Sequence, residues 1–86
     1  MKVELDRQHD AACFAFSATA SVRQVKLDNA RIIDYAADGS VVGVEFMSPS
    51  RGVNLAGVPR AAEVEREVRR LGLPVRLAPA NLARPG

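Results

Sequence analysis

The stretch that decides the fold is Ile33 to Phe46, which reads IDYAADGSVVGVEF. Apolar residues alternate with others on both sides of a short polar centre, as in the two strands of a β-hairpin. Asp38-Gly39 lies at that centre, where glycine accepts the positive φ that a hairpin loop requires. Gly43 interrupts the second strand, which indicates either a bulge or the close approach of another backbone.

Three more strands are predicted before this hairpin. Val3 and Leu5 mark an opening strand, and the alternation resumes over residues 11–16 and again over residues 22–27. Polar turns separate these segments, and Asp28-Asn29 provides the turn before the hairpin. The pattern predicts an antiparallel meander of four to five strands over residues 1–47.

The second of these strands is apolar on both faces, one bulky and one small. The bulky face consists of Ala12, Phe14 and Phe16, and the small face of Ala11, Cys13 and Ala15. Because a purely polar outer face is absent, we expect another element or a second molecule to cover the small face.

After Met47-Ser48-Pro49-Ser50 the hydrophobic period changes. An apolar stripe at helical spacing predicts one C-terminal helix within residues 59–72, packed on the sheet. Pro59 suits the helix start, and Gly72 suits the position after its end, with Leu73 folding back onto the helix. The fold class is therefore α+β, with a single domain over residues 1–77 and a flexible tail over residues 78–86. The stripe consists of Ala61, Val64, Val68 and Leu71.

Composition excludes several classes of protein. The chain has 86 residues, of which 48% are hydrophobic and 26% charged, close to the globular average, so we expect one folded domain. A single cysteine excludes an internal disulfide and a cysteine-based zinc site. No apolar run reaches the roughly 18–20 residues of a membrane span, and the N-terminus lacks the pattern of a signal peptide. We expect a cytoplasmic protein that does not enter the membrane.

Charge is unevenly distributed along the chain. Residues 1–46 contain five Lys and Arg against seven Asp and Glu, whereas residues 47–86 contain seven Arg against three Glu. Arg66, Arg69 and Arg70 lie on the polar half of the predicted helix, where they could contact a nucleic acid or an acidic partner. Glutamates interleave with them, so a solvated helix face is the alternative reading.

Few residues suggest catalysis. His9, between Asp6 and Asp10, lies in a predicted turn, and one histidine with loop carboxylates is a poor zinc site. Cys13 is predicted to be a buried structural residue. Paired carboxylates from Asp34, Asp38 and Glu45 are the one acid–base arrangement that the chain could build, although their spacing fixes no separation. We predict no catalytic residue, no metal and no cofactor.

As a whole, the pattern resembles a bacterial family of domains of unknown function, family 2283. The resemblance covers about residues 1–51. It implies a compact antiparallel meander, no established enzyme activity, and a role as the antitoxin-like partner of a small toxin. Departures from the family pattern are Cys13 in place of a large aromatic residue, Ala15 in place of a polar one, and Ala30 in place of glycine. The matching segments are residues 6–11, residues 25–28, residues 34–46, Ser48 and Ser50-Arg51.

The sequence therefore predicts a small non-catalytic protein-interaction module that binds a small protein partner or forms a homodimer. A thin core in a chain of this size favours oligomerisation. The alternative is a nucleic-acid-binding protein that uses the arginines of the C-terminal helix. The candidate interface residues are Ala11, Cys13, Ala15 and Gly43.

Overall fold

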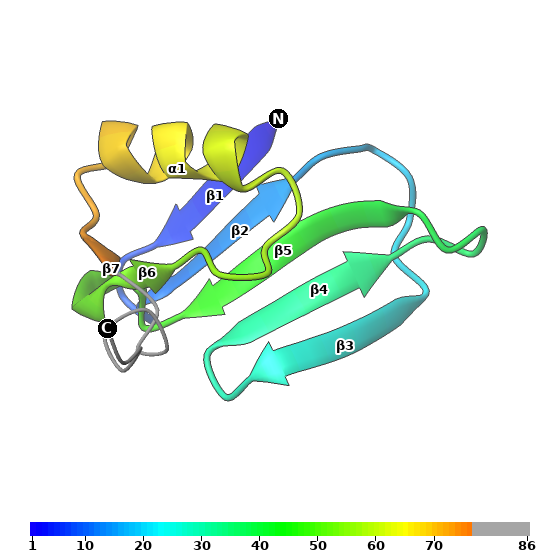
Figure 1. The fold of residues 1–86 in the computed structure, drawn as a ribbon, viewed down its shortest axis with the longest axis horizontal. Helices are drawn as coiled ribbons and strands as arrows, with labels where there is room; N and C mark the ends of the chain where they lie inside the picture. Colours follow the sequence, from blue (N-terminus) through cyan, green and yellow to red (C-terminus); the bar gives the residue numbers. More distant parts are fainter. Residues whose placement is uncertain (77–86) are drawn as a thin grey trace, which may run out of the picture.

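The computed structural model describes residues 1–76 of the chain. It contains a five-stranded antiparallel sheet, one α-helix and a pair of short parallel strands (Figure 1). The predicted α+β class is confirmed, whereas the predicted tail over residues 78–86 lies outside the described residues. The elements are β1 (Lys2–Asp6), β2 (Ala11–Ala15), β3 (Arg23–Asp28), β4 (Arg31–Tyr35), β5 (Val41–Met47), the short 3₁₀ helix η1 (Pro49–Arg51), β6 (Val53–Asn54), α1 (Ala61–Arg70) and β7 (Val75–Arg76).

The strands of the large sheet lie in the order β1-β2-β5-β4-β3, and all neighbours are antiparallel. β1 and β2 form one hairpin, while β3, β4 and β5 form consecutive hairpins that return the chain to the side of β2. The predicted meander is confirmed, and the β2–β3 loop crosses to the far edge, so β5 lies at the centre (Figure 1). The β4–β5 turn has the predicted form, with Gly39 at φ 86° and the Ala36 N–H donating to the Ser40 carbonyl at 2.8 Å.

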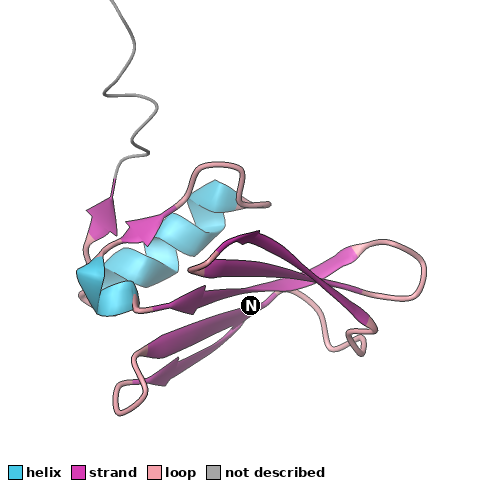
Figure 2. Ribbon diagram, turned by 90° about the horizontal axis from the view of Figure 1, so that it is seen from below, coloured by secondary structure: helices cyan, strands magenta, loops and turns pink. Residues whose placement is uncertain are grey.

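The hydrophobic core lies on one face of the sheet, beneath α1 (Figure 2). Phe14 of β2 and Phe46 of β5 pack edge to face, with ring centroids 5.7 Å apart and planes at 82°. Val64 and Val68 of α1 belong to the same cluster, and each is 0% exposed. The predicted packing of the helix on the sheet is confirmed, since the apolar stripe of the helix and the bulky face of β2 exclude water from each other.

The helix ends as predicted but begins differently. Gly72 adopts φ 76°, and the Leu73 N–H donates to the Val68 carbonyl at 3.0 Å, which closes the helix end in a Schellman motif. Pro59, however, precedes the N-cap residue and is not the first helical residue. Arg60 occupies the N-cap at φ 53°, where its guanidinium lies 4.8 Å from the Phe16 ring centroid.

The small face of β2 is not covered by α1. The helix packs on the side of the sheet that carries Phe14, and alternate residues of a strand point to opposite sides. Ala11, Cys13 and Ala15 therefore face away from the helix and remain half-buried. The expectation that another element of the chain covers this face is wrong for residues 1–76, because the single helix lies on the other side.

Gly43 lies where β5 passes closest to β2. A Cβ atom at this position would be 2.8 Å from the Phe14 carbonyl oxygen and 3.4 Å from the Ala15 Cα. The β4–β5 pairing also shifts its register between Asp34 and Tyr35, beside this glycine. The close approach and the bulge, which the sequence left as alternatives, both occur here.

We therefore expect Gly43→Ala to lower the free energy of unfolding by about 1–3 kcal/mol. The added methyl group would collide with backbone atoms of β2, which cannot move aside as a flexible side chain could. Urea denaturation measures this loss. Gly39→Asn is the matched control, since asparagine tolerates positive φ and open space surrounds Gly39. Equal stability of Gly43→Ala and the wild type would show that the backbones of β2 and β5 leave room for a methyl group at this position.

Candidate functional site

The candidate site is the face of the five-stranded sheet opposite α1, which we call the open face. Strand register places Ala15 directly opposite Gly43, and Cys13 directly opposite Glu45. The four predicted interface residues, Ala11, Cys13, Ala15 and Gly43, therefore lie together at its centre. The first three are half-buried, and Gly43 is buried.

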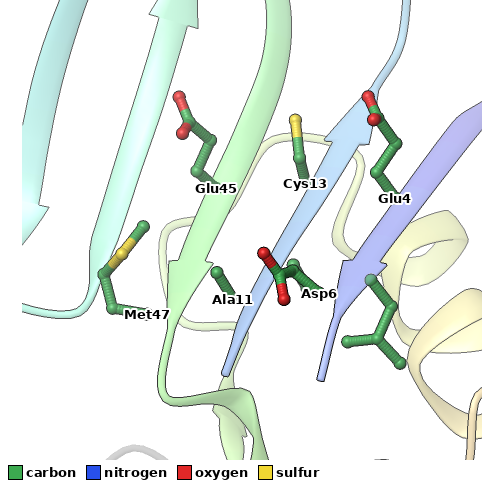
Figure 3. Close-up of a pocket in the computed structure, with 8 residues that line it drawn as sticks. Glu4, Asp6, Ala11, Cys13, Glu45 and Met47 are labelled. Carbon is green, nitrogen blue, oxygen red and sulfur yellow. The ribbon is translucent and has the colours of Figure 1, made fainter. Parts of the chain in front are cut away.

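A shallow hollow of about 240 Å³ lies over β1, β2 and the end of β5 on this face (Figure 3). Figure 3 shows the side chains of Glu4, Cys13 and Glu45 side by side and projecting in the same direction. The register explains this row, because Glu4 pairs with Cys13 and Cys13 pairs with Glu45. Cys13 thus lies between two carboxylates.

Burial and the neighbouring carboxylates both change the pKa of the Cys13 thiol. Burial raises the pKa of Cys13, and the charges of Glu45, Asp34 and Glu4 raise it further. A raised pKa leaves little thiolate at neutral pH, so the side chain behaves as a small apolar group. This agrees with the predicted structural role of Cys13, although the residue is half-buried and not fully enclosed.

Asp34 and Glu45 form a carboxylate pair on the same face. The Gln24 amide donates to Asp34 Oδ1 and to Glu45 Oε2, each at 2.8 Å, and so bridges the two side chains. Asp34 is buried, at 7% exposure. Burial raises the pKa of Glu45, as does its hydrogen bond with Asp34, whereas Gln24 partly offsets the shift.

The pair that the sequence suggested is therefore Asp34 with Glu45. Asp38 is elsewhere, because its carboxylate accepts hydrogen bonds from Ser40 in the β4–β5 turn. Gln24 was not singled out from the sequence. Only the register of β3 against β4, which places Gln24 opposite Asp34, could have indicated its role.

The raised pKa of Glu45 makes stability depend on pH. The folded state holds this proton more tightly than the unfolded chain, so stability falls as pH rises from the usual carboxyl range through the raised value. Glu45→Gln removes the charge and keeps a carbonyl for Gln24. We expect it to increase stability at neutral pH by up to about 1 kcal/mol, a gain that disappears in acid.

Thermal unfolding measured between about pH 4 and about pH 8 tests this, with Glu4→Gln as the control for net charge. A Glu45→Gln variant that is less stable than the wild type at neutral pH would contradict the assignment.

Asp6 and Asp10, the two acidic residues on either side of His9, accept hydrogen bonds that stabilise the β1–β2 turn and its contact with η1. The Asp6 carboxylate accepts from the His9 backbone N–H at 3.0 Å and contacts His9 Nδ1 at 2.8 Å, with both side chains exposed. The Asp10 carboxylate accepts from the Ser50 N–H at 3.1 Å and from the Ser50 hydroxyl at 2.5 Å. Asp10 thereby fastens the β1–β2 turn to η1.

Among residues 1–76, no three or more His, Cys, Asp or Glu side chains are placed to hold a metal ion.

Asp10→Ala should lower the free energy of unfolding by about 1–3 kcal/mol, because it removes both bonds to Ser50 and places alanine at φ 52°. Asp10→Asn is the matched control, since asparagine accepts one of these bonds and tolerates the left-handed conformation. Chemical denaturation measures both variants. Equal losses for the two would show that the carboxamide oxygen cannot replace the carboxylate, and no loss would exclude the fastening role.

The arginines of α1 are largely paired with the glutamates that interleave with them. Arg69 Nη2 lies 2.8 Å from Glu65 Oε2, and Arg70 forms an ion pair with Glu67. Arg66 lies near enough to Glu63 to help lower the pKa of that carboxyl, after the larger effect of Arg60. The three arginines share one helix, but most of their charge is compensated locally.

The geometry defines a small α+β domain with a helix on one face of an antiparallel sheet and an open second face. Residues 2–50 match the family model described as "Protein of unknown function (DUF2283)". The chain therefore belongs to this family, as its sequence pattern suggested. The matched segment ends before β6 and α1.

No curated protein and no solved structure matches the chain. In the part of the chain that the structure describes, α1 is too short and too polar to cross a membrane, and no other helix could do so.

Proposed function

We propose that this chain is a non-catalytic protein-binding module, antitoxin-like in type, whose open face binds a small protein partner. The observation that carries the proposal is the half-exposed strip of small side chains, Ala11, Cys13 and Ala15 beside Gly43, on the face that α1 leaves uncovered. Small side chains on a flat sheet let another backbone or an apolar side chain approach closely.

The charges around this strip favour a basic partner. Glu4 and Glu45 flank Cys13, and Asp34 lies on the neighbouring row. On the same face Lys2 lies opposite Ala15 at the end of the strip, and Lys26 lies opposite Ile32 on the far side of Glu45, so the negative charge is concentrated around Cys13. A partner that places lysine or arginine there gains electrostatic complementarity.

The same charges oppose self-association through the open face. Two copies placed face to face would bring the Glu4–Cys13–Glu45 row against an equally acidic row, which is unfavourable. Proteins that act on nucleic acids carry basic surfaces that neutralise phosphates. An acidic sheet face is complementary to such a surface, which supports an antitoxin-like role toward a basic toxin.

The alternative function, nucleic-acid binding through Arg66, Arg69 and Arg70, has less support. The ion pairs of Arg69 and Arg70 compensate two of the three charges, and counterion release requires cations that are free to meet phosphates. This alternative remains an outcome of the experiment below.

The test compares tagged full-length wild type with Ala15→Arg, expressed at the native level and captured with and without nuclease. Ala15→Arg places a bulky cation in the strip, directly opposite Gly43, and should weaken partner binding by about tenfold or more. Ala20→Arg is the matched control, because Ala20 lies in the exposed β2–β3 loop.

A stoichiometric protein held by the wild type and by Ala20→Arg, but not by Ala15→Arg, would support the proposal. Its release should be promoted by salt, because the binding includes opposite charges. A partner retained equally by Ala15→Arg would contradict the assigned face. Recovery of nuclease-sensitive nucleic acid alone would favour the arginine-based function.

A further inference from the structure

A single row of apolar side chains crosses all five strands on the helix side of the sheet. The register pairs each member with the next, from β1 through β2, β5 and β4 to β3. Phe14 and Val44 are 0% exposed and Ile33 is 2% exposed, whereas Val25 at the end of the row is 36% exposed. The row consists of Val3, Phe14, Val44, Ile33 and Val25.

The row becomes exposed because α1 does not extend over β3. Figure 1 and Figure 2 show the helix on the side of the sheet near β1 and β2, with β3 at the opposite edge. All six residues of β3 are exposed. Of the four large hydrophobic residues exposed in the described chain, three are Val25, Leu27 and the adjoining Val22.

An edge strand also presents unpaired backbone N–H and C=O groups along its outer side, and these accept another strand. Exposed apolar side chains beside such groups distinguish an edge suited to pairing from a protected one. Both edge strands carry three charged residues, but Val3 and Leu5 of β1 pack against the core, whereas Val25 and Leu27 of β3 are exposed. β3 is therefore the edge that a further strand would extend.

We propose that β3 pairs antiparallel with β3 of a second copy of this chain, around a twofold axis at Val25. The register follows from the apolar row, because only this centre places Val25 against Val25 of the second copy and continues the row into the second sheet. A shift by one residue would place Val25 opposite a residue of the other face. A shift by two residues toward the C-terminus would place Lys26 directly opposite Lys26 of the second copy, which is a like-charge pair.

The charges of β3 fit this register. Lys26 lies opposite Gln24 of the second copy, and Arg23 lies opposite Leu27, beside Asp28 of that copy. The register shift between Lys26 and Asp28 turns Asp28 toward the side of Arg31, with which it forms an ion pair at 3.0 Å. Arg23 in turn stacks on Tyr35 of its own chain, 4.6 Å from the ring centroid, so these charges are satisfied within each copy. In this register no like charges lie directly opposite each other.

This dimer leaves the open face free. A twofold axis perpendicular to the sheet keeps both helices on one side and both open faces on the other. The inference does not rest on the proposed function, since it uses a different surface. If both hold, the dimer presents two partner sites on one continuous sheet, and a partner with two contact points would bind by avidity.

The first test measures the solution mass of the full chain by sedimentation or light scattering over a range of concentrations. The wild type should approach twice its monomer mass of 9.2 kDa. Val25→Asp places like charges on the axis and should weaken the dimer by about tenfold or more. Ala20→Asp, in the exposed loop, should leave it unchanged, and circular dichroism checks that both variants fold.

The second test uses cysteine substitutions and does not depend on destabilising the dimer. Directly opposite residues in antiparallel strands have Cα atoms about 4.5–5.5 Å apart, within reach of a disulfide. Val25→Cys should therefore form a covalent dimer on mild oxidation. Lys26→Cys should not form one, because residue 26 of the second copy lies two positions along the strand from the point directly opposite. The wild type, whose one cysteine is Cys13, shows how much covalent dimer forms through that residue.

A monomeric wild type at all concentrations would overturn the proposal. So would a dimer that survives Val25→Asp and gives no disulfide with Val25→Cys, because the contact would then lie on another surface. Loss of the dimer in Val25→Asp together with the selective Val25→Cys disulfide is the result that the proposal predicts.

Discussion

The structure depends on the contact of Val64 and Val68 with the sheet that carries the edge-to-face pair of Phe14 and Phe46. Without tryptophan, and with one tyrosine and three phenylalanines, the chain concentrates its bulky apolar groups in this one layer. One helix of ten residues can shield only part of a five-stranded sheet. The buried face, the exposed β3 edge and the uncovered opposite face all follow from this limit.

The core also joins the part of the chain that matches the family with the part that follows it. The family match ends at residue 50, whereas the helix that buries Phe14 and Phe46 spans residues 61–70. Within the matched part, Asp6 and Asp10 accept hydrogen bonds that organise the β1–β2 turn and join it to η1. The open face is built from the same matched strands, and it carries the small side chains of β2 together with the carboxylates of Glu4 and Glu45.

Much of the fold was predictable because its signals are local. The alternation of apolar residues identified the strands, and Asp38-Gly39 identified the central turn. The spacing of Val64 and Val68 identified the apolar stripe of the helix. The side of β2 that the helix covers was not predictable, because both faces of that strand are apolar. Strand order decided which residues meet, so the bridge from Gln24 to Asp34 and Glu45 could not be derived from spacing. Pro59 was misplaced because Arg60 adopts a left-handed conformation that tertiary contacts stabilise.

The division of the sheet into a covered and an open face requires that α1 lie on the Phe14 face and leave the Ala15 face free. Nuclear Overhauser contacts of the Val64 and Val68 methyl groups in the full chain test it most directly. We expect contacts from these methyl groups to the rings of Phe14 and Phe46, and none to the methyl groups of Ala11 and Ala15. Contacts to the two alanines, with none to the rings, would place the helix on the opposite face of the sheet.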